Sequence, residues 1–190
     1  MDDLGSKLTE RLRGRICLLG LGNEAYEDDG FGVQLGRAVS GLVRANVVLA
    51  GATPERWLAT ADLQTVDHVV FMDAVNFGAP PGSVILLGAA DIEARYPQVS
   101  THKLSLGLLA TWAESNGHTR AWLLGAQPFS LGRGEHLSST LQSTLDSLAD
   151  LLVESLGTPE SHARAITLRA DPAHLAPIPA PASPTLEAPG

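Results

Sequence analysis

Apolar residues follow two alternating patterns along this chain. Short, mostly apolar runs that end in glycine or another turn residue are typical of buried parallel strands, whereas apolar residues that recur every three or four positions predict helices. We expect strands over residues 15–20, 46–51, 68–75, 83–88 and 120–128, and helices over residues 30–43, 54–64, 104–117 and 137–156.

This alternation predicts an α/β fold in which helices cover both faces of a sheet. We therefore expect a three-layer α/β/α sandwich with a twisted, mostly parallel sheet of about five strands. The fourth strand follows the turn-forming sequence FGAPPG at residues 77–82. So tight a connection favours an antiparallel strand, which would make the sheet mixed.

The polarity of the chain divides it into three parts. Residues 1–14 form a polar N-terminal extension, residues 15–156 carry the expected strands and helices of one α/β domain, and residues 157–190 are rich in proline and alanine. Seven of the 12 prolines fall in this last part, so we expect a disordered or extended tail there.

Charge and cysteine content exclude several classes of protein. The net charge is −8 and no block of lysine or arginine occurs, which argues against nucleic-acid binding. Cys17 is the only cysteine, so the chain cannot form an internal disulfide. It lies within the first expected strand and is expected in the core. The polar N-terminus and the lack of a long apolar stretch lead us to expect a soluble, cytoplasmic protein without a membrane segment.

The segment GLGNEAYEDDGFG, at residues 20–32, concentrates negative charge where many α/β proteins hold an anion. Its acidic residues are Glu24, Glu27, Asp28 and Asp29. A glycine loop after a strand can bind a dinucleotide, but these carboxylates would repel the pyrophosphate and no acid for the ribose follows between residues 30 and 54. Peptidyl-tRNA hydrolases share the sequence GLGN, yet they continue with basic and histidine-bearing residues. The loop therefore favours a metal site, because carboxylate oxygens are good metal ligands.

Two further residues can meet this loop at one edge of the sheet. Asp73 ends the third expected strand, and parallel strands bring their carboxyl ends to the same edge, so Asp73 should lie near Asp28 and Asp29. His102 precedes or begins the helix after the fourth strand, and it joins them if that helix starts at the same edge. Two carboxylates and one imidazole suit a divalent ion such as Zn²⁺ or Ni²⁺ and leave positions open for another ligand.

Other polar residues near these positions have plainer interpretations. An aspartate before a helix is often its N-cap, and we assign Asp28 to capping or to support of the metal ligands. Asn23 is expected to fix the loop through side-chain hydrogen bonds. His68 and His118 are expected at the surface and His136 beside a helix start, so none of these histidines is a candidate ligand.

Four motifs together resemble the endopeptidases that mature [NiFe] hydrogenases. These motifs are GLGNEAYEDDGFG, MDAVNFGAPPG, STHKLSLGLL and LLGAQP, in the order and approximate spacing of that family over residues 15–156. The resemblance implies a protease that removes a short C-terminal extension from the large-subunit precursor of a [NiFe] hydrogenase after nickel insertion. It implies that Asp29, Asp73 and His102 bind the metal and carry catalysis. The sequence AGATPERW lacks the commoner aspartate before its glycine and resembles the branch that processes hydrogenases of the formate hydrogenlyase type.

The metal implied by the resemblance is Ni²⁺ carried by the substrate precursor, for which Zn²⁺ or Cd²⁺ could substitute in a crystal. An incomplete ligand set on the protease would make cleavage conditional on nickel insertion. Two alternatives stay open: a nickel-dependent assembly chaperone that binds the precursor without cutting it, and a conventional metallohydrolase with its own Zn²⁺. It also stays open whether the metal polarises the scissile carbonyl or only docks the precursor.

Overall fold

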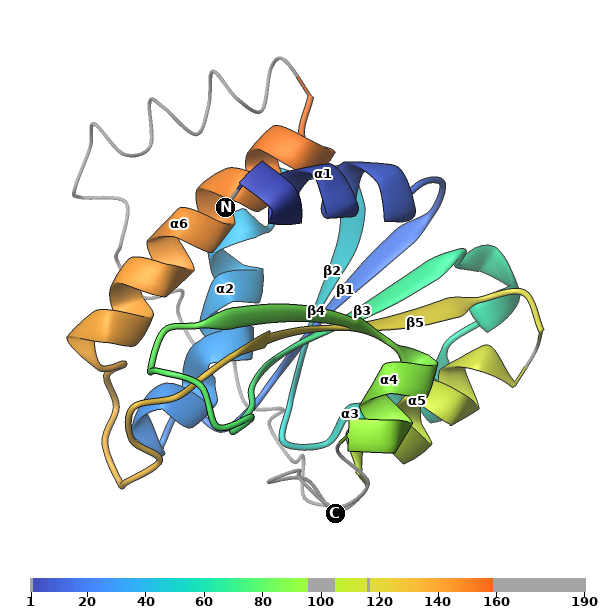
Figure 1. The fold of residues 1–190 in the computed structure, drawn as a ribbon. Coiled ribbons are helices and arrows are strands. Elements are labelled where there is room, and N and C mark those ends of the chain that lie inside the picture. Colours follow the sequence, from blue (N-terminus) through green and yellow to red (C-terminus); the bar gives the residue numbers. More distant parts are fainter. Residues whose placement is uncertain (1, 96–104, 116, 159–190) are drawn as a thin grey trace, which may run out of the picture.

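The computed structural model describes residues 2–95, 105–115 and 117–158, which form helices on both sides of a five-stranded sheet (Figure 1). The strands are β1 (Ile16–Leu21), β2 (Ala45–Gly51), β3 (His68–Ala74), β4 (Val84–Gly88) and β5 (Arg120–Ala126). The α-helices are α1 (Asp2–Arg11), α2 (Phe31–Val39), α3 (Pro54–Thr60), α4 (Ala89–Arg95), α5 (Leu106–Glu114) and α6 (Ser139–Leu156). Two short 3₁₀ turns are η1 (Glu27–Gly30) and η2 (Leu63–Thr65).

The sheet is mixed, with the strand order β2-β1-β3-β5-β4. Strand β1 pairs in parallel with both β2 and β3, and β3 pairs in parallel with β5. Strand β4 pairs antiparallel with β5, as the tight connection before it predicted. The expected fold class, an α/β sandwich around a mostly parallel sheet, is therefore confirmed.

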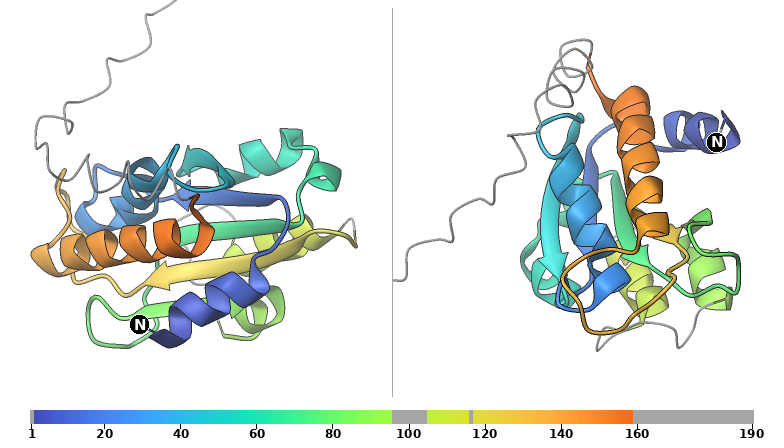
Figure 2. Two further views of the ribbon diagram at one scale, coloured as in Figure 1. Left: turned by 90° about the horizontal axis from the view of Figure 1, so that it is seen from above. Right: turned by 90° about the vertical axis from the view of Figure 1, so that its left-hand side faces the viewer.

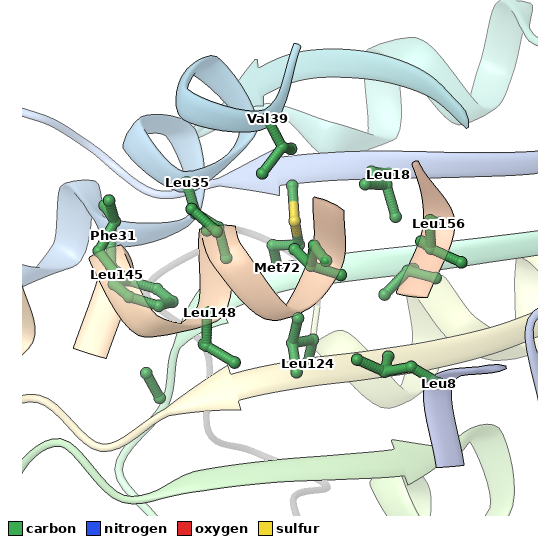
Figure 3. Close-up of a cluster of buried hydrophobic side chains, with 14 of the residues drawn as sticks. Leu8, Leu18, Phe31, Leu35, Val39, Met72, Leu124, Leu145, Leu148 and Leu156 are labelled. Atoms are coloured by element: carbon green, nitrogen blue, oxygen red, sulfur yellow. The ribbon is translucent and has the colours of Figure 1, made fainter. Parts of the chain in front are cut away.

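Side chains alternate between two apolar cores, one on each face of the sheet. On one face, Leu18 of β1 and Met72 of β3 pack in the core that α1, α2 and α6 cover (Figure 3). On the other face, Leu19 and Phe71 pack under α3, α4 and α5. Because adjacent strand residues point to opposite faces, both cores require the continuous apolar runs that the central strands have.

Some local structure differs from the sequence-based expectations. Helix α1 lies within the segment that we expected to be a polar extension, and it carries leucines at four-residue spacing. Leu8 is fully buried in the core beneath α6 and Leu12 is nearly so. The helix expected over residues 54–64 ends at Thr60 and is followed by the separate turn η2. None of the described helices is both long and apolar enough to cross a membrane.

Candidate active site

The loop after β1 is folded tightly onto the carboxyl end of the sheet, and two glycines make this possible. Gly22 has a φ of +113°, and a Cβ atom there would collide with the carbonyl oxygen of Asp29. A Cβ atom on Gly32 would collide with the carbonyl oxygen of Met72 in β3. Since glycine alone tolerates both the positive φ and such contacts, these positions bring η1 and the start of α2 against the ends of β1 and β3.

Asp29 differs from the rest of this loop in the hydrogen bonds that the described residues make to its side chain. Its side chain is 4% exposed, and its Oδ2 atom accepts a hydrogen bond of 2.9 Å from the backbone N–H of Asn23. Its Oδ1 atom is buried and accepts no hydrogen bond from the described residues. A buried carboxylate oxygen without a donor costs free energy, so this atom marks a place where a bound cation or donor would be stabilised.

Asp73 comes to the same edge from the next strand. It is the penultimate residue of β3 and is 1% exposed. It is paired with Gly125 of β5 in the parallel ladder, and because glycine has no side chain, no side chain of the paired residue packs beside that of Asp73. Turn η1 contacts β3 directly. The structure thus places two of the sequence-predicted site residues, Asp29 and Asp73, in contacting elements at the carboxyl edge of the sheet.

Asp28 differs from Asp29 in its hydrogen bonds, because it accepts them from both ends of a long loop. This β5–α6 loop consists of residues 127–138. The Oδ2 atom of Asp28 accepts hydrogen bonds from the backbone N–H groups of Phe129 (2.8 Å) and Ser130 (3.1 Å). Ser138 donates its N–H to Oδ1 (2.7 Å) and its hydroxyl to Oδ2 (3.0 Å). Helix α2 has no side-chain cap, so Asp28 does not cap it, whereas its partner Ser138 caps α6.

The four acids of the loop therefore have four different environments. Glu24 forms an ion pair of 2.7 Å with Arg37, which lowers the pKa of Glu24. The side chain of Glu27 lies close to Gly132 and Gly134 of the β5–α6 loop. Asp28 is saturated with hydrogen bonds, and Asp29 retains a buried oxygen. The accumulation of acids is thus not one multidentate site, and Asp29 alone among the four has a buried oxygen without a donor among the described residues.

A second loop beside Asp73 is fixed by Gln127, which the sequence analysis did not single out. The side-chain Oε1 of Gln127 accepts hydrogen bonds from the backbone N–H groups of Phe77 (2.8 Å) and Ala79 (3.3 Å). Its amide nitrogen donates to Oδ1 of Asn76 (3.2 Å). Gln127 is buried, and its position inside the motif LLGAQP is the signal that could have identified it. This network holds the turn that follows Asp73.

The third predicted site residue, His102, lies outside the described residues. Helix α5 follows it in the chain, and Ser105 caps that helix. Helix α5 ends at the start of β5, where Glu114 accepts a hydrogen bond from the N–H of Ala121, so its first turn lies away from the amino edge of the sheet. His68, which we expected at the surface, is only partly exposed and accepts a hydrogen bond of 3.0 Å from the indole N–H of Trp122.

Within the parts of the chain that the structure describes, no three side chains of the His, Cys, Asp or Glu type are grouped to hold a metal ion. The described part of the predicted ligand set is the pair Asp29 and Asp73. Glu55, in the first turn of α3, also has a buried oxygen that accepts no hydrogen bond from described residues. Since α3 follows β2, Glu55 lies at the same edge of the sheet. The signal in the sequence is Pro54, because proline often begins a helix and so places Glu55 in the first turn after the strand.

Comparison with known proteins supports a relationship over most of the chain. The family model described as HycI, hydrogenase maturation protease, matches residues 33–155, a range that includes Asp73 and begins just after Asp29. The hydrogenase expression/formation protein HupD of Rhodobacter capsulatus is 31% identical over 62% of this chain, which spans 59% of that relative's length. The HupD protein of Rhizobium leguminosarum bv. viciae is 27% identical over 86% of this chain and 83% of its own.

A solved structure shows the same relationship in three dimensions. The crystal structure of the [NiFe] hydrogenase maturation protease HycI from Thermococcus kodakarensis KOD1 superposes with a TM-score of 0.70 at 30% identity. The match covers 81% of this chain and 98% of that protein. These matches decide against the dinucleotide-binding and peptidyl-tRNA hydrolase interpretations of the glycine loop. The chain therefore belongs to the hydrogenase maturation protease family, a family of peptidases.

Proposed function

We propose that this protein is an endopeptidase that cleaves the C-terminal extension from the large-subunit precursor of a [NiFe] hydrogenase after nickel has been inserted. Membership of the family supports the class of reaction and the class of substrate. The observation that carries the finer proposal is the Oδ1 atom of Asp29, a buried carboxylate oxygen that accepts no hydrogen bond from the described residues. A cation delivered by the substrate would neutralise this oxygen.

In this proposal the nickel ion belongs to the precursor and is recognised by Asp29, Asp73 and His102. The two carboxylates come from contacting elements at one edge of the sheet, and His102 is assigned through the family resemblance. Oxygen and imidazole ligands suit Ni²⁺. A protease that supplies only part of a coordination sphere depends on the precursor for the rest, so a precursor without nickel would lack the group that holds it in place.

Recognition of nickel also positions the bond to be cut. A precursor anchored at this edge brings its following peptide bond to the same place, which converts its hydrolysis into a reaction within one complex. Water adds to the scissile carbonyl carbon, the C–N bond breaks, and the released amine takes up a proton. The products are the shortened large subunit and a free C-terminal peptide, which are distinguishable by mass.

The test uses purified large-subunit precursor in a nickel-loaded and a nickel-free form, each incubated with the full-length protein. Mass spectrometry follows loss of the C-terminal peptide, and the metal content of the protein is measured before mixing. We expect cleavage of the loaded precursor and at least about a hundredfold slower cleavage of the nickel-free form. Adding Ni²⁺ alone to the protease with nickel-free precursor controls for free metal.

Three outcomes would contradict the proposal. Equal cleavage of both precursors would refute dependence on substrate nickel. Tight binding of the loaded precursor without release of a peptide would identify a chaperone. Stoichiometric Zn²⁺ retained through purification, with activity lost on its removal, would identify a metallohydrolase with a resident ion.

A further inference from the structure

We propose that Tyr26, Phe129, Leu131 and Arg133 form a docking surface for the precursor, which binds there through an apolar segment that carries a carboxylate opposite Arg133. This inference rests on the proposed function, because it names a second region of contact with the same substrate. It assigns substrate selection to the β5–α6 loop, and it leaves the nickel-binding residues at the carboxyl edge of the sheet.

The distribution of exposed apolar side chains identifies this surface. The large apolar side chains that are well exposed in the described residues are Tyr26, Leu49, Leu108, Trp112, Phe129 and Leu131. Half of them belong to two paired segments, the turn around η1 and the β5–α6 loop. Phe129 is the most exposed of all, at 69%. Isolated exposed apolar residues need no explanation, but several on adjoining segments are typical of a contact surface.

These side chains stand on a backbone that is held firmly in place. Asp28, which is fully buried, binds both ends of the β5–α6 loop with the hydrogen bonds described above. Further along, the N–H of Glu27 donates to the carbonyl of Gly134 (2.8 Å), and the N–H of Gly134 donates to the carbonyl of Ala25 (3.1 Å). Aromatic side chains on a fixed backbone lose little conformational entropy on binding, which is the property of good interface anchors.

Arg133 gives the docking surface a charge preference. Its guanidinium carbon lies 5.9 Å from the centre of the Tyr26 ring, a cation–π distance, and the side chain is exposed. It forms no ion pair with any residue that the structure describes. Glu27 lies close to the two glycines that flank Arg133, but it forms no ion pair with Arg133 in the part of the chain that the structure describes. The guanidinium therefore has its hydrogen-bond donors available for a carboxylate of the partner, which it can bind through two parallel hydrogen bonds.

The docking surface is continuous with the proposed catalytic edge. Asp28 and Asp29 are consecutive residues of η1, so the residue that fixes the loop adjoins the residue with the spare oxygen. Both views of Figure 2 show the β5–α6 loop passing beside the beginning of α2, next to η1. A precursor whose nickel reaches Asp29 therefore has the docking surface within reach of the chain that surrounds the metal.

The test compares the wild-type protein with the double variant Phe129→Ser/Leu131→Ser and with Arg133→Glu. Equilibrium binding of each to nickel-loaded precursor, immobilised through its N-terminus, is measured by biolayer interferometry, and cleavage kinetics are measured separately. We expect the dissociation constant and KM of each variant to rise about tenfold or more, with kcat changed by less than about twofold. Arg133→Gln should have a smaller effect than Arg133→Glu, because it adds no repulsion.

Leu49→Ser is the matched control, since Leu49 is as exposed as Leu131 but lies on β2, and it should bind like the wild type. Circular dichroism and thermal unfolding check that each variant is folded. Unchanged affinity in the double variant, or an equal loss in Leu49→Ser, would overturn the docking surface even if the wild type cleaves the precursor. Loss of binding in the docking-surface variants alone would support it even if the wild type binds without cleaving. No binding by the wild type would overturn it.

Discussion

The amino and carboxyl edges of the sheet use aspartate in opposite ways. At the amino edge Asp67, just before β3, accepts a hydrogen bond from the backbone N–H of Arg15 (2.7 Å), and it pairs with the guanidinium of Arg15 (2.9 Å) and with His118 (2.8 Å). These contacts, above all the hydrogen bonds from Arg15, hold the pKa of Asp67 well below its ordinary value. At the carboxyl edge of the sheet, the side chain of Asp29 is buried and accepts one hydrogen bond from the described residues, none of which donates to its Oδ1 atom.

This difference separates a structural acid from a candidate functional one. Asp67 is partly exposed and fully engaged by its own chain, so it fixes the amino edge of the sheet and has little capacity for a ligand. Asp29 is kept from water, and no described residue donates a hydrogen bond to its Oδ1 atom to compensate for the burial. A fold can contain a buried carboxylate oxygen without a donor where a bound ligand compensates for the free energy of its desolvation. The comparison therefore predicts which acids can be replaced without loss of activity.

The largest effect is expected from replacing the acids of the carboxyl edge. Asp29→Asn and Asp73→Asn should each slow cleavage of nickel-loaded precursor by more than the roughly 10–100-fold that loss of an outer-sphere partner of a metal ligand causes. Asp29→Asn should unfold at the same temperature as the wild type or higher, because a buried charge is removed. Single-turnover cleavage and differential scanning calorimetry measure the two effects.

Asp67→Asn is the matched control for this prediction. It should lower the unfolding temperature and leave the rate of cleavage within about twofold of the wild type, because its partners lie at the opposite edge. If Asp67→Asn and Asp29→Asn lost activity and stability in parallel, the distinction between the two edges would be wrong.

A smaller effect, on stability, is expected from Asp28→Ala. The change leaves the N–H groups of Phe129, Ser130 and Ser138 without their acceptor. Loss of several hydrogen bonds to a buried charge should cost about 3 kcal/mol or more of unfolding free energy. For a domain of this size that corresponds to a fall in unfolding temperature of roughly 6–12 °C.

Glu24→Gln, in the same loop, is the comparison for Asp28→Ala in urea unfolding. Its ion pair with Arg37 is exposed, and such pairs contribute about 0–1 kcal/mol. Similar losses in the two variants would show that Asp28 does not anchor the β5–α6 loop.

The smallest effect concerns the pH dependence of stability at the amino edge. Burial lowers the pKa of His68, with Asp67 raising it and Arg120 lowering it further as weaker influences. The unfolded chain therefore binds more protons than the folded one between the two pKa values, so stability rises with pH in that interval. The contribution of neutral His68 to stability should be fully present above about pH 6.5 and be lost as the pH falls towards the lowered pKa.

Protonation of the acceptor nitrogen of His68 would also break its hydrogen bond with Trp122. The free energy of urea unfolding, measured between about pH 5 and 7.5, should therefore fall less steeply with acidification in His68→Gln than in the wild type. An equal slope in both proteins would assign the pH dependence to other groups.

The sequence predicted the elements that depend on apolar periodicity. Residues 68–75 and 120–128 fill two cores and have long apolar runs, so their strands were recognisable, and the turn before β4 indicated its direction. Helix α1 was missed because its overall polarity concealed leucines spaced four residues apart. Such a stripe predicts burial only if a partner surface exists, and that surface is α6, more than a hundred residues later in the chain.

The candidate site was predictable to the level of strand ends but not of individual contacts. The rule that parallel strands end at one edge predicts that Asp29 and Asp73 lie at the same edge of the sheet, where the structure has them. The adjacent acids Asp28 and Asp29 could not be told apart, because their difference lies in the long-range partners of Asp28 at Phe129 and Ser138. His102 lies outside the described residues, so its assignment remains a prediction.

The single peptide unit between Asp28 and Asp29 gives the molecule a short mechanical linkage. The loop is bound by the side chain of Asp28, so apart from the side-chain torsions of the two residues only the ψ torsion of Asp28 and the φ torsion of Asp29 lie between the loop and the Asp29 carboxylate. A shift of that loop on binding of a client would therefore reach the Asp29 carboxylate through a short path of covalent bonds. A loop redesigned for a different client would have to preserve the grip of Asp28, or the geometry of its neighbour would change with it.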